Sequence, residues 1–373
     1  MGASVFTGMI LSFVLLTIAA RKVTENELGV YFLLFALVST LELFGGFGLQ
    51  LSATKFVAST KNFQMQEKVV NTILTFRLVT LILFSALSLI FKSILLSLFP
   101  SDLLSDLFIY VPILFSIELG AVTVAAILQG IHQYRSLATV RIIASLANFS
   151  LALFFLFVLE LGVEGLILAS VISLAGELIA GLFLIPTKIS LNFHRNTVRE
   201  LLKFSIPLQG NDFLTFLISK VDVFLLGALM GTTQIAYLGI ARKIPDNLNR
   251  LYQSLNSVYF PQMSSLFAQN RKEEAENVLN HFVRLLSFAM LFVALGFIFF
   301  QEEIIIILFS EKYLPTAPAL GLFMVAVAIS VISQLFDASF IAAGSPAFII
   351  AVNLTVATVG IIGDIVMIPR LGL

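Results

Sequence analysis

The chain of 373 residues has no cysteine, no tryptophan and only three histidines. Without cysteine there are no disulfide bonds, thiol nucleophiles or zinc–thiolate sites. The histidines, at positions 132, 194 and 281, lie far apart and lack the spacing of metal ligands. We therefore expect neither a metal centre nor a cofactor.

Charged residues are also scarce, at 12% of the chain, about half the share in a soluble domain. The formal net charge is zero, so no basic surplus is available to bind nucleic acid. Hydrophobic residues make up 59%, and the mean hydropathy is +1.02. This composition excludes a soluble globule, a disordered chain and a disulfide scaffold.

Apolar runs of membrane-spanning length recur along the whole chain. A transmembrane helix needs about 20 such residues, and the runs are continuous rather than alternating, which excludes strands. We therefore predict an all-α polytopic membrane protein with about 11 transmembrane helices. The runs lie at 3–20, 30–53, 72–98, 107–128, 138–159, 165–185, 204–227, 235–258, 282–300, 318–341 and 348–368.

The loops between these runs indicate orientation. Lys and Arg of the predicted loops lie mainly on the side that the N-terminus shares, which places the N-terminus in the cytoplasm. The longest connections have only about 20 residues, too few for a catalytic domain outside the membrane. We therefore do not expect an enzyme.

An internal repeat is visible in the segments that follow equivalent runs. Val23–Tyr31 resembles Met230–Leu238, which begins 207 positions later. Leu98–Pro100 resembles Leu308–Ser310, at an offset of 210 positions. An even number of spans per repeat predicts two lobes of the same orientation, related by an axis along the membrane normal.

The repeat predicts an N-terminal six-helix lobe at 1–203 and a C-terminal lobe at 204–373. The triplet Leu161–Val163 leads into a sixth span, whereas its counterpart Leu371–Leu373 ends the chain. We therefore predict five helices in the second lobe, with helix 12 onward missing. We expect the natural gene to continue past this point.

Polar residues of the run at 204–227 gather on one helix face. At 100° per residue, a half-polar helix at membrane depth is typical of a wall of a wet cavity. Hydrogen bonding between packed helices is the alternative. The face comprises Asp212, Thr215, Ser219 and Asp222, flanked by Gln209 and Lys220 on one side and by Asn211 on the other.

Cations of the runs at 204–227 and 235–258 outnumber the acidic residues expected to neutralise them, Asp222 and Asp246. A surplus of cations suits a phosphate or diphosphate, which arginine binds in bidentate geometry. The alternative is that a cationic side chain extends to the membrane interface, above all that of Arg250. The cations are Lys220, Arg242, Lys243 and Arg250.

Two further charges lie inside predicted spans. Glu42 is near the cluster Gly45-Gly46-Phe47-Gly48, which predicts a break or close contact in its helix. Arg77 lies two turns into the third span, and we expect it to extend to the interface.

Several motifs in the second half carry a family resemblance. They are Phe204-Ser205-Ile206-Pro207-Leu208, Ser219-Lys220-Val221-Asp222, Phe260-Pro261-Gln262-Met263-Ser264, Tyr313-Leu314-Pro315-Thr316-Ala317-Pro318 and Ile368-Pro369-Arg370-Leu371-Gly372-Leu373. In order and spacing the chain resembles the polysaccharide (O-antigen or lipid-linked oligosaccharide) flippases of the multidrug/oligosaccharidyl-lipid/polysaccharide exporter superfamily. The similarity covers nearly the whole chain and is densest from 200 to 373.

The resemblance implies transport of a polyprenyl-diphosphate-linked oligosaccharide across the cytoplasmic membrane for cell-surface polysaccharide biosynthesis. It implies two lobes that rock around a central cavity; lacking helix 12, this chain departs from that pattern. We expect the cavity to bind diphosphate and sugar through Lys220, Arg242, Lys243, Arg250, Gln209, Asn211 and Ser219. We expect Asp212, Asp222, Asp246 and Glu42 to form charge pairs or to couple transport to Na⁺ or H⁺.

Two other functions remain open from the sequence. A drug exporter of the same superfamily would use the buried carboxylates for Na⁺ or H⁺ coupling, but the cationic surplus opposes a cavity for cationic drugs. An integral-membrane glycan polymerase or ligase would need a larger outer loop.

Overall fold

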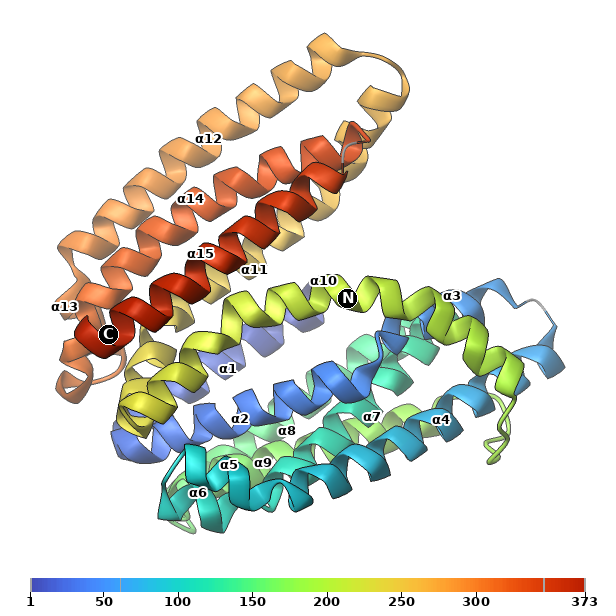
Figure 1. Ribbon diagram of the computed structural model, residues 1–373, viewed down its shortest axis with the longest axis horizontal. Helices are drawn as coiled ribbons and strands as arrows, with labels where there is room; N and C mark the ends of the chain where they lie inside the picture. The colour runs from blue at the N-terminus through green and yellow to red at the C-terminus, as the bar shows by residue number, and fades with distance from the viewer. Residues whose placement is uncertain (1, 61, 345, 372–373) are drawn as a thin grey trace. The chain divides into compact units, whose positions relative to one another are not determined.

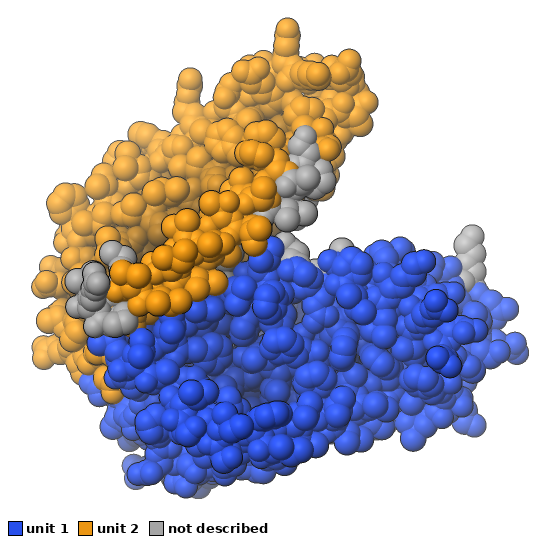
Figure 2. Space-filling model, in the orientation of Figure 1, with its two compact units in different colours: residues 1–232 blue, residues 233–373 orange. Residues whose placement is uncertain are grey.

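The computed structural model describes residues 2–60, 62–344 and 346–371, and every regular element in these ranges is a helix (Figure 1). The all-α prediction is therefore confirmed for the described chain. Contacts divide the protein into two compact units, unit 1 at Met1–Thr232 and unit 2 at Thr233–Leu373, coloured separately in Figure 2.

Unit 1 is built around α7 (Tyr110–Gly130). Of its most apolar stretch, 72% is buried, because five other helices pack around it. The others are α1 (Gly2–Lys22), α2 (Glu25–Gly46), α3 (Leu49–Ser59), α4 (Phe63–Ile90), α5 (Lys92–Leu98), α6 (Asp102–Leu107), α8 (Tyr134–Phe157), α9 (Gly162–Phe183) and α10 (Arg195–Leu229).

Unit 2 is joined by a polar seam between its first helix and α14. The Tyr259 and Ser339 hydroxyls are 2.7 Å apart, and Gln334 Nε2 donates to Asn249 Oδ1 at 3.3 Å. Its helices are α11 (Thr232–Ala268), α12 (Lys272–Phe299), α13 (Gln301–Leu308), the 3₁₀-helix η1 (Glu311–Thr316), α14 (Ala317–Ala342) and α15 (Pro346–Leu371).

Local sequence signals fix where the helices of unit 1 begin. Thr24 and Glu27 form a capping box at the start of α2, each side chain accepting from the other's backbone N–H. Asn62 caps α4 by accepting from the backbone N–H groups of Gln64 and Met65. These caps satisfy N–H groups that have no partner within the helix.

Eight described helices are long and apolar enough to cross a membrane, which makes this a multi-pass membrane protein. The predicted count of eleven is not confirmed. The run at 348–368 lies in α15, where the apolar helix, Ala351–Val366, is shorter than the eight. The runs at 204–227 and 235–258 lie in α10 and α11, which are also not among the eight. Both helices carry several charged side chains, and these lower their mean hydropathy.

The compact units meet at 232/233, whereas the repeat places a lobe boundary at 203/204. The difference arises because α10 packs against α2, α3 and α4 of unit 1. The compact units are defined by contacts, whereas the predicted lobes are defined by a sequence repeat. The predicted lobes therefore stay a prediction.

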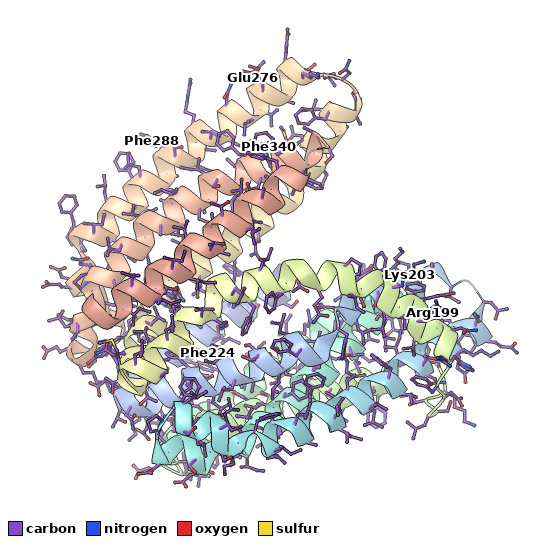
Figure 3. The ribbon with its side chains drawn as sticks, in the orientation of Figure 1. Arg199, Lys203, Phe224, Glu276, Phe288 and Phe340 are labelled. Atoms are coloured by element: carbon purple, nitrogen blue, oxygen red, sulfur yellow. The ribbon has the colours of Figure 1, made fainter. Side chains whose placement is uncertain are left out.

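Figure 3 shows two contrasting surfaces. Phe288 projects from α12, is 65% exposed and packs against Phe292 with ring centroids 4.6 Å apart. Such an apolar face suits contact with lipid. Arg199 and Lys203, by contrast, lie exposed on the first turns of α10, one helical turn apart.

Candidate functional site

The site is built on a break between α2 and α3. Phe47 (φ 51°) and Gly48 (φ 59°) both adopt the left-handed conformation, which ends one helix and starts the next. A Cβ at position 48 would lie 2.8 Å from the carbonyl oxygen of Ser205 on α10. Glycine is required there by both backbone conformation and space. The break predicted from the glycine cluster is confirmed.

Arg77 of α4 holds the broken end of α2. Its Nη1 donates to the carbonyl oxygen of Gly45 at 2.8 Å, and its Nη2 donates to that of Gly46 at 3.2 Å. Its Nε donates to Thr123 Oγ1 at 2.7 Å on α7. Carbonyls at a helix C-terminus lack internal partners and carry partial negative charge, so a guanidinium satisfies and neutralises them.

The expected extension of Arg77 to the membrane interface is therefore wrong. The side chain is 3% exposed and turns inward, because the carbonyls of the break and the Thr123 hydroxyl supply acceptors at its depth. Sequence reasoning missed this residue as part of the site. The available signal was the glycine cluster, whose break predicts orphan carbonyls that need a donor.

Helix α10 supplies the facing wall. It contains Pro207, and Gln209 two residues later donates through Nε2 to the carbonyl oxygen of Leu43 on α2. This bond and the close approach at Gly48 tie α10 to both sides of the break. Farther along the same helix, Ser219 Oγ donates to the carbonyl oxygen of Phe216 at 3.4 Å.

Between α10 and the break lies a cavity of about 560 Å³, which we call the break cavity. That volume lies within the range of sites for drug-sized ligands. Its polar lining is unusually rich for a chain this apolar, and comes from α2, α3, α4 and α10. The polar lining residues are Ser39, Glu42, Gln50, Arg77, Gln209, Asp212, Thr215 and Ser219.

The charges of the break cavity are unevenly satisfied. Arg77 is engaged by the carbonyls and by Thr123, whereas Oε1 of Glu42 is enclosed and accepts no hydrogen bond from any described residue. Asp212 is exposed within the cavity wall. A carboxylate at membrane depth costs about 3 kcal/mol or more unless it is neutralised. This cavity can therefore receive hydroxyl-rich or cationic groups.

The structure brings together four of the predicted site residues: Glu42, Gln209, Asp212 and Ser219 all line the break cavity, and so does Thr215 of the predicted polar face. Two more lie on α10 without lining it. Of these, Asp222 is 7% exposed and accepts from the backbone N–H of Val223 at 2.8 Å, and the other is Lys220. The side chain of Asn211 lies outside the described residues.

The remaining predicted residues belong to unit 2. The Arg242 guanidinium stacks over the ring of Phe323, 5.1 Å from its centroid, which ties α11 to α14. Lys243 is half-buried, while Asp246 and Arg250 are exposed. The four cations are thus divided between the two units, and the predicted cationic cluster stays a prediction.

Comparison with known proteins places this geometry in a family. The sequence profile of a family described as "Polysaccharide biosynthesis protein" matches residues 18–318, most of the chain. The chain belongs to this polysaccharide biosynthesis protein family. Its match covers both sides of the break cavity and the cationic stretch of α11.

One curated relative of this family member is the "Probable low-salt glycan biosynthesis flippase Agl15" of Haloferax volcanii. It is 22% identical over 312 residues, which cover 83% of this chain. The matched region spans 64% of that relative's own length.

Solved structures share the fold. A lipid II flippase, MurJ, in an inward closed conformation aligns with a TM-score of 0.78 at 17% identity, covering 100% of this chain and 82% of its own. An inward-facing multidrug resistance MATE family transporter of the MOP superfamily aligns with a TM-score of 0.75 at 15% identity, covering 96% and 85%. At such identities the likeness shows the architecture alone.

Proposed function

We propose that this protein is a transporter, not an enzyme, and that it flips a polyprenyl-diphosphate-linked oligosaccharide across the cytoplasmic membrane for cell-surface polysaccharide assembly. The supporting observation is a polar break cavity at membrane depth in a member of the polysaccharide biosynthesis protein family. The name of the Haloferax relative and the fold shared with a lipid II flippase point the same way.

The chemistry of the break cavity fits the sugar part of such a substrate. Moving an oligosaccharide through hydrocarbon is slow because its hydroxyls lose their hydrogen bonds to water. The hydroxyls, amides and carboxylates of the lining replace those bonds, notably Gln50, Asp212 and Thr215. No covalent bond changes in this process, so the protein lowers a solvation barrier only.

The diphosphate needs positive charge. Arg77 provides a fixed charge in the cavity wall, but its donors are engaged by the carbonyls of the break and by Thr123. We assign direct contact with the diphosphate to Lys220, Arg242, Lys243 and Arg250, in an arrangement that forms as the protein alternates between inward and outward access. The N-terminus would be cytoplasmic, as the Lys and Arg of the loops indicate, and Na⁺ or H⁺ would drive the cycle.

A second candidate is export of a cationic solute. The described lining of the break cavity contains two carboxylates, Glu42 and Asp212, against the single guanidinium of Arg77. This charge balance favours a cation, and the chain shares its fold with a multidrug transporter.

The decisive experiment uses purified protein in liposomes that hold a polyprenyl-diphosphate sugar. The exposure of the sugar to an external sugar-modifying reagent is followed over time. We expect exposure well above that of empty liposomes. Replacement of a cation that bonds the diphosphate, by Lys220→Ala or by Arg242→Ala/Lys243→Ala, should slow it about tenfold or more.

Lys92→Ala is the matched control, because Lys92 lies over the Phe108 ring and away from the cavity. It should retain the wild-type rate. Efflux of a cationic dye from the same liposomes, with no exposure of the lipid-linked sugar, would overturn the proposal in favour of the second candidate.

A further inference from the structure

A second polar cavity, of about 220 Å³, lies within unit 1 among α1, α2, α7, α8 and α9. We call it the lateral cavity. None of its lining residues lines the break cavity. Its polar lining residues are Ser12, Tyr31, Glu118, Ser145, Asn148, Ser170, Ser173 and Glu177.

Two carboxylates, Glu118 and Glu177, line the lateral cavity, and one of them has no cation among the described residues to neutralise it. Arg141 Nε lies 3.4 Å from Glu177 Oε1, and both side chains are mostly buried. Glu118 on the central helix α7 forms no ion pair and no hydrogen bond with any described residue. Its negative charge is therefore left over at membrane depth, where it costs about 3 kcal/mol or more.

The neighbouring hydroxyls do not neutralise this charge, because they bond to one another and to the backbone. Asn148 Nδ2 donates to Ser173 Oγ at 3.0 Å and to Ser170 Oγ at 3.3 Å. Ser170 donates to the carbonyl oxygen of Leu166 at 3.0 Å, and Ser173 donates to that of Ser170 at 3.1 Å. The network is closed without Glu118.

A single proton suffices to neutralise the leftover charge of one carboxylate. Among the described residues, no group of three His, Asp or Glu side chains converges as metal ligands. A proton needs only one carboxylate, and the cavity is large enough to admit the water that would deliver it. We infer that Glu118 is an exchangeable proton-binding site in the lateral cavity, separate from the break cavity.

Two helices, α2 and α7, contribute to the walls of both cavities. Helix α2 places Tyr31 in the lateral cavity and Glu42 in the break cavity, while α7 places Glu118 in the first and Leu119 in the second. The carboxylates of Glu42 and Glu118 lie within electrostatic range of each other. Because like charges repel, a proton on Glu118 favours a charged Glu42, and its loss favours a protonated Glu42.

The other charged or titratable groups near this pair come from α2, α4, α8, α9 and α10. On α2, Tyr31 lines the lateral cavity together with Glu118. On α4, Arg77 faces Glu42, and on α10, Asp212 shares the break cavity with it. On α9, Glu177 faces Glu118 and is held by Arg141 of α8. Helices α1 and α3 add no charged residue to either lining. Under the proposed function, on which this step rests, Glu118 couples proton movement to the charge of the break cavity.

Infrared difference spectroscopy across a pH titration of the purified full chain tests the site without transport. We expect one protonated carboxyl band that disappears in Glu118→Gln and persists in Glu164→Gln. Glu164 is the matched control, since it accepts from the Tyr110 hydroxyl at 2.8 Å at the start of α7 and does not line the lateral cavity. If the glutamine variant fails to fold, Glu118→Asp must move the band instead of removing it.

A band unchanged in both Glu118 variants would overturn the inference, as would a band that shifts with Na⁺ at constant pH. In liposomes, Glu118→Gln should abolish the response of transport to a pH gradient while retaining transport down a substrate gradient. If the wild type moves no lipid-linked sugar but shows the band, the proposed function fails and the proton site stands.

Discussion

The segment at α2 and α3 and the segment at α11 begin at equivalent positions of the predicted repeat but fold differently. Glu25 starts α2, and Thr232, 207 positions later, starts α11. The first segment breaks at Phe47 and Gly48, whereas α11 runs unbroken to Ala268 despite containing two prolines. Of the two segments that the predicted repeat pairs, one therefore lines a cavity with a broken helix and the other is a continuous helix.

We attribute the break in one segment and the continuous helix in the other to four sequence positions and to one hydrogen-bond donor. Gly45-Gly46-Phe47-Gly48 corresponds to Tyr252-Gln253-Ser254-Leu255, which contains no glycine and favours a helix. Free carbonyls at a break also need a donor, which Arg77 supplies in unit 1. Four substitutions can test these two causes.

The largest effect is expected at Arg77. Arg77→Met leaves the carbonyls of the break unpaired and removes a positive charge beside Glu42, so the free energy of unfolding should fall by about 3 kcal/mol. Arg77→Lys keeps the charge but not the three-way geometry and should lose about half of that. Denaturant unfolding in detergent measures both. Arg284→Met, at an exposed arginine of α12, is the control and should change stability by less than about 0.5 kcal/mol.

Equal losses of unfolding free energy in the Arg77 and Arg284 variants would show that the break does not depend on the hydrogen bonds of Arg77.

The next effect is expected at Gly48. Gly48→Ala imposes a left-handed conformation on alanine and brings a Cβ against Ser205, which should cost about 2 kcal/mol in unfolding free energy. Gly296→Ala is the control, because a Cβ there meets open space within α12. That control should gain up to about 1 kcal/mol. An unchanged unfolding free energy in Gly48→Ala would mean that the break tolerates a side chain.

A smaller effect is expected at Thr123, the acceptor for Arg77 Nε. Thr123→Val keeps the shape but leaves a buried donor unpaired, at a cost of about 1.5 kcal/mol. Thr355→Val is the matched control, since that exposed hydroxyl also donates to a carbonyl one turn earlier, at 2.9 Å. Thermal and denaturant unfolding should separate the pair by at least about 1 kcal/mol. Identical stabilities of the Thr123 and Thr355 variants would show that Thr123 is not needed to hold Arg77 at the break.

The smallest effect is expected in α11, at the counterpart of Gly48. Leu255→Gly should unfold more easily than Leu255→Ala by about 1 kcal/mol, the difference in helix propensity, with no new break. Amide hydrogen exchange along α11 checks that the helix persists. Loss of protection on both sides of position 255 in the glycine variant alone would show that one glycine suffices for a break.

The sequence predicts the helical class and the polar face of α10 because both depend on local periodicity. It predicts the break because glycine acts on its own backbone. It does not predict the inward turn of Arg77, since the deciding acceptor, Thr123, is 46 positions away on another helix. The lateral cavity is hidden for the same reason: five helices contribute to it, and its leftover charge is visible only after Arg141 is paired with Glu177.

The length of α10 has a mechanical consequence. Its 35 residues extend about 52 Å, about 20 Å more than a hydrocarbon layer about 30 Å thick. Its first turns carry Arg199 and Lys203, and the turns that follow carry Gln209 and Asp212, which line the break cavity. Anionic headgroups that hold the basic end would therefore act on the cavity wall through one continuous helix, which passes Pro207 between Lys203 and Gln209.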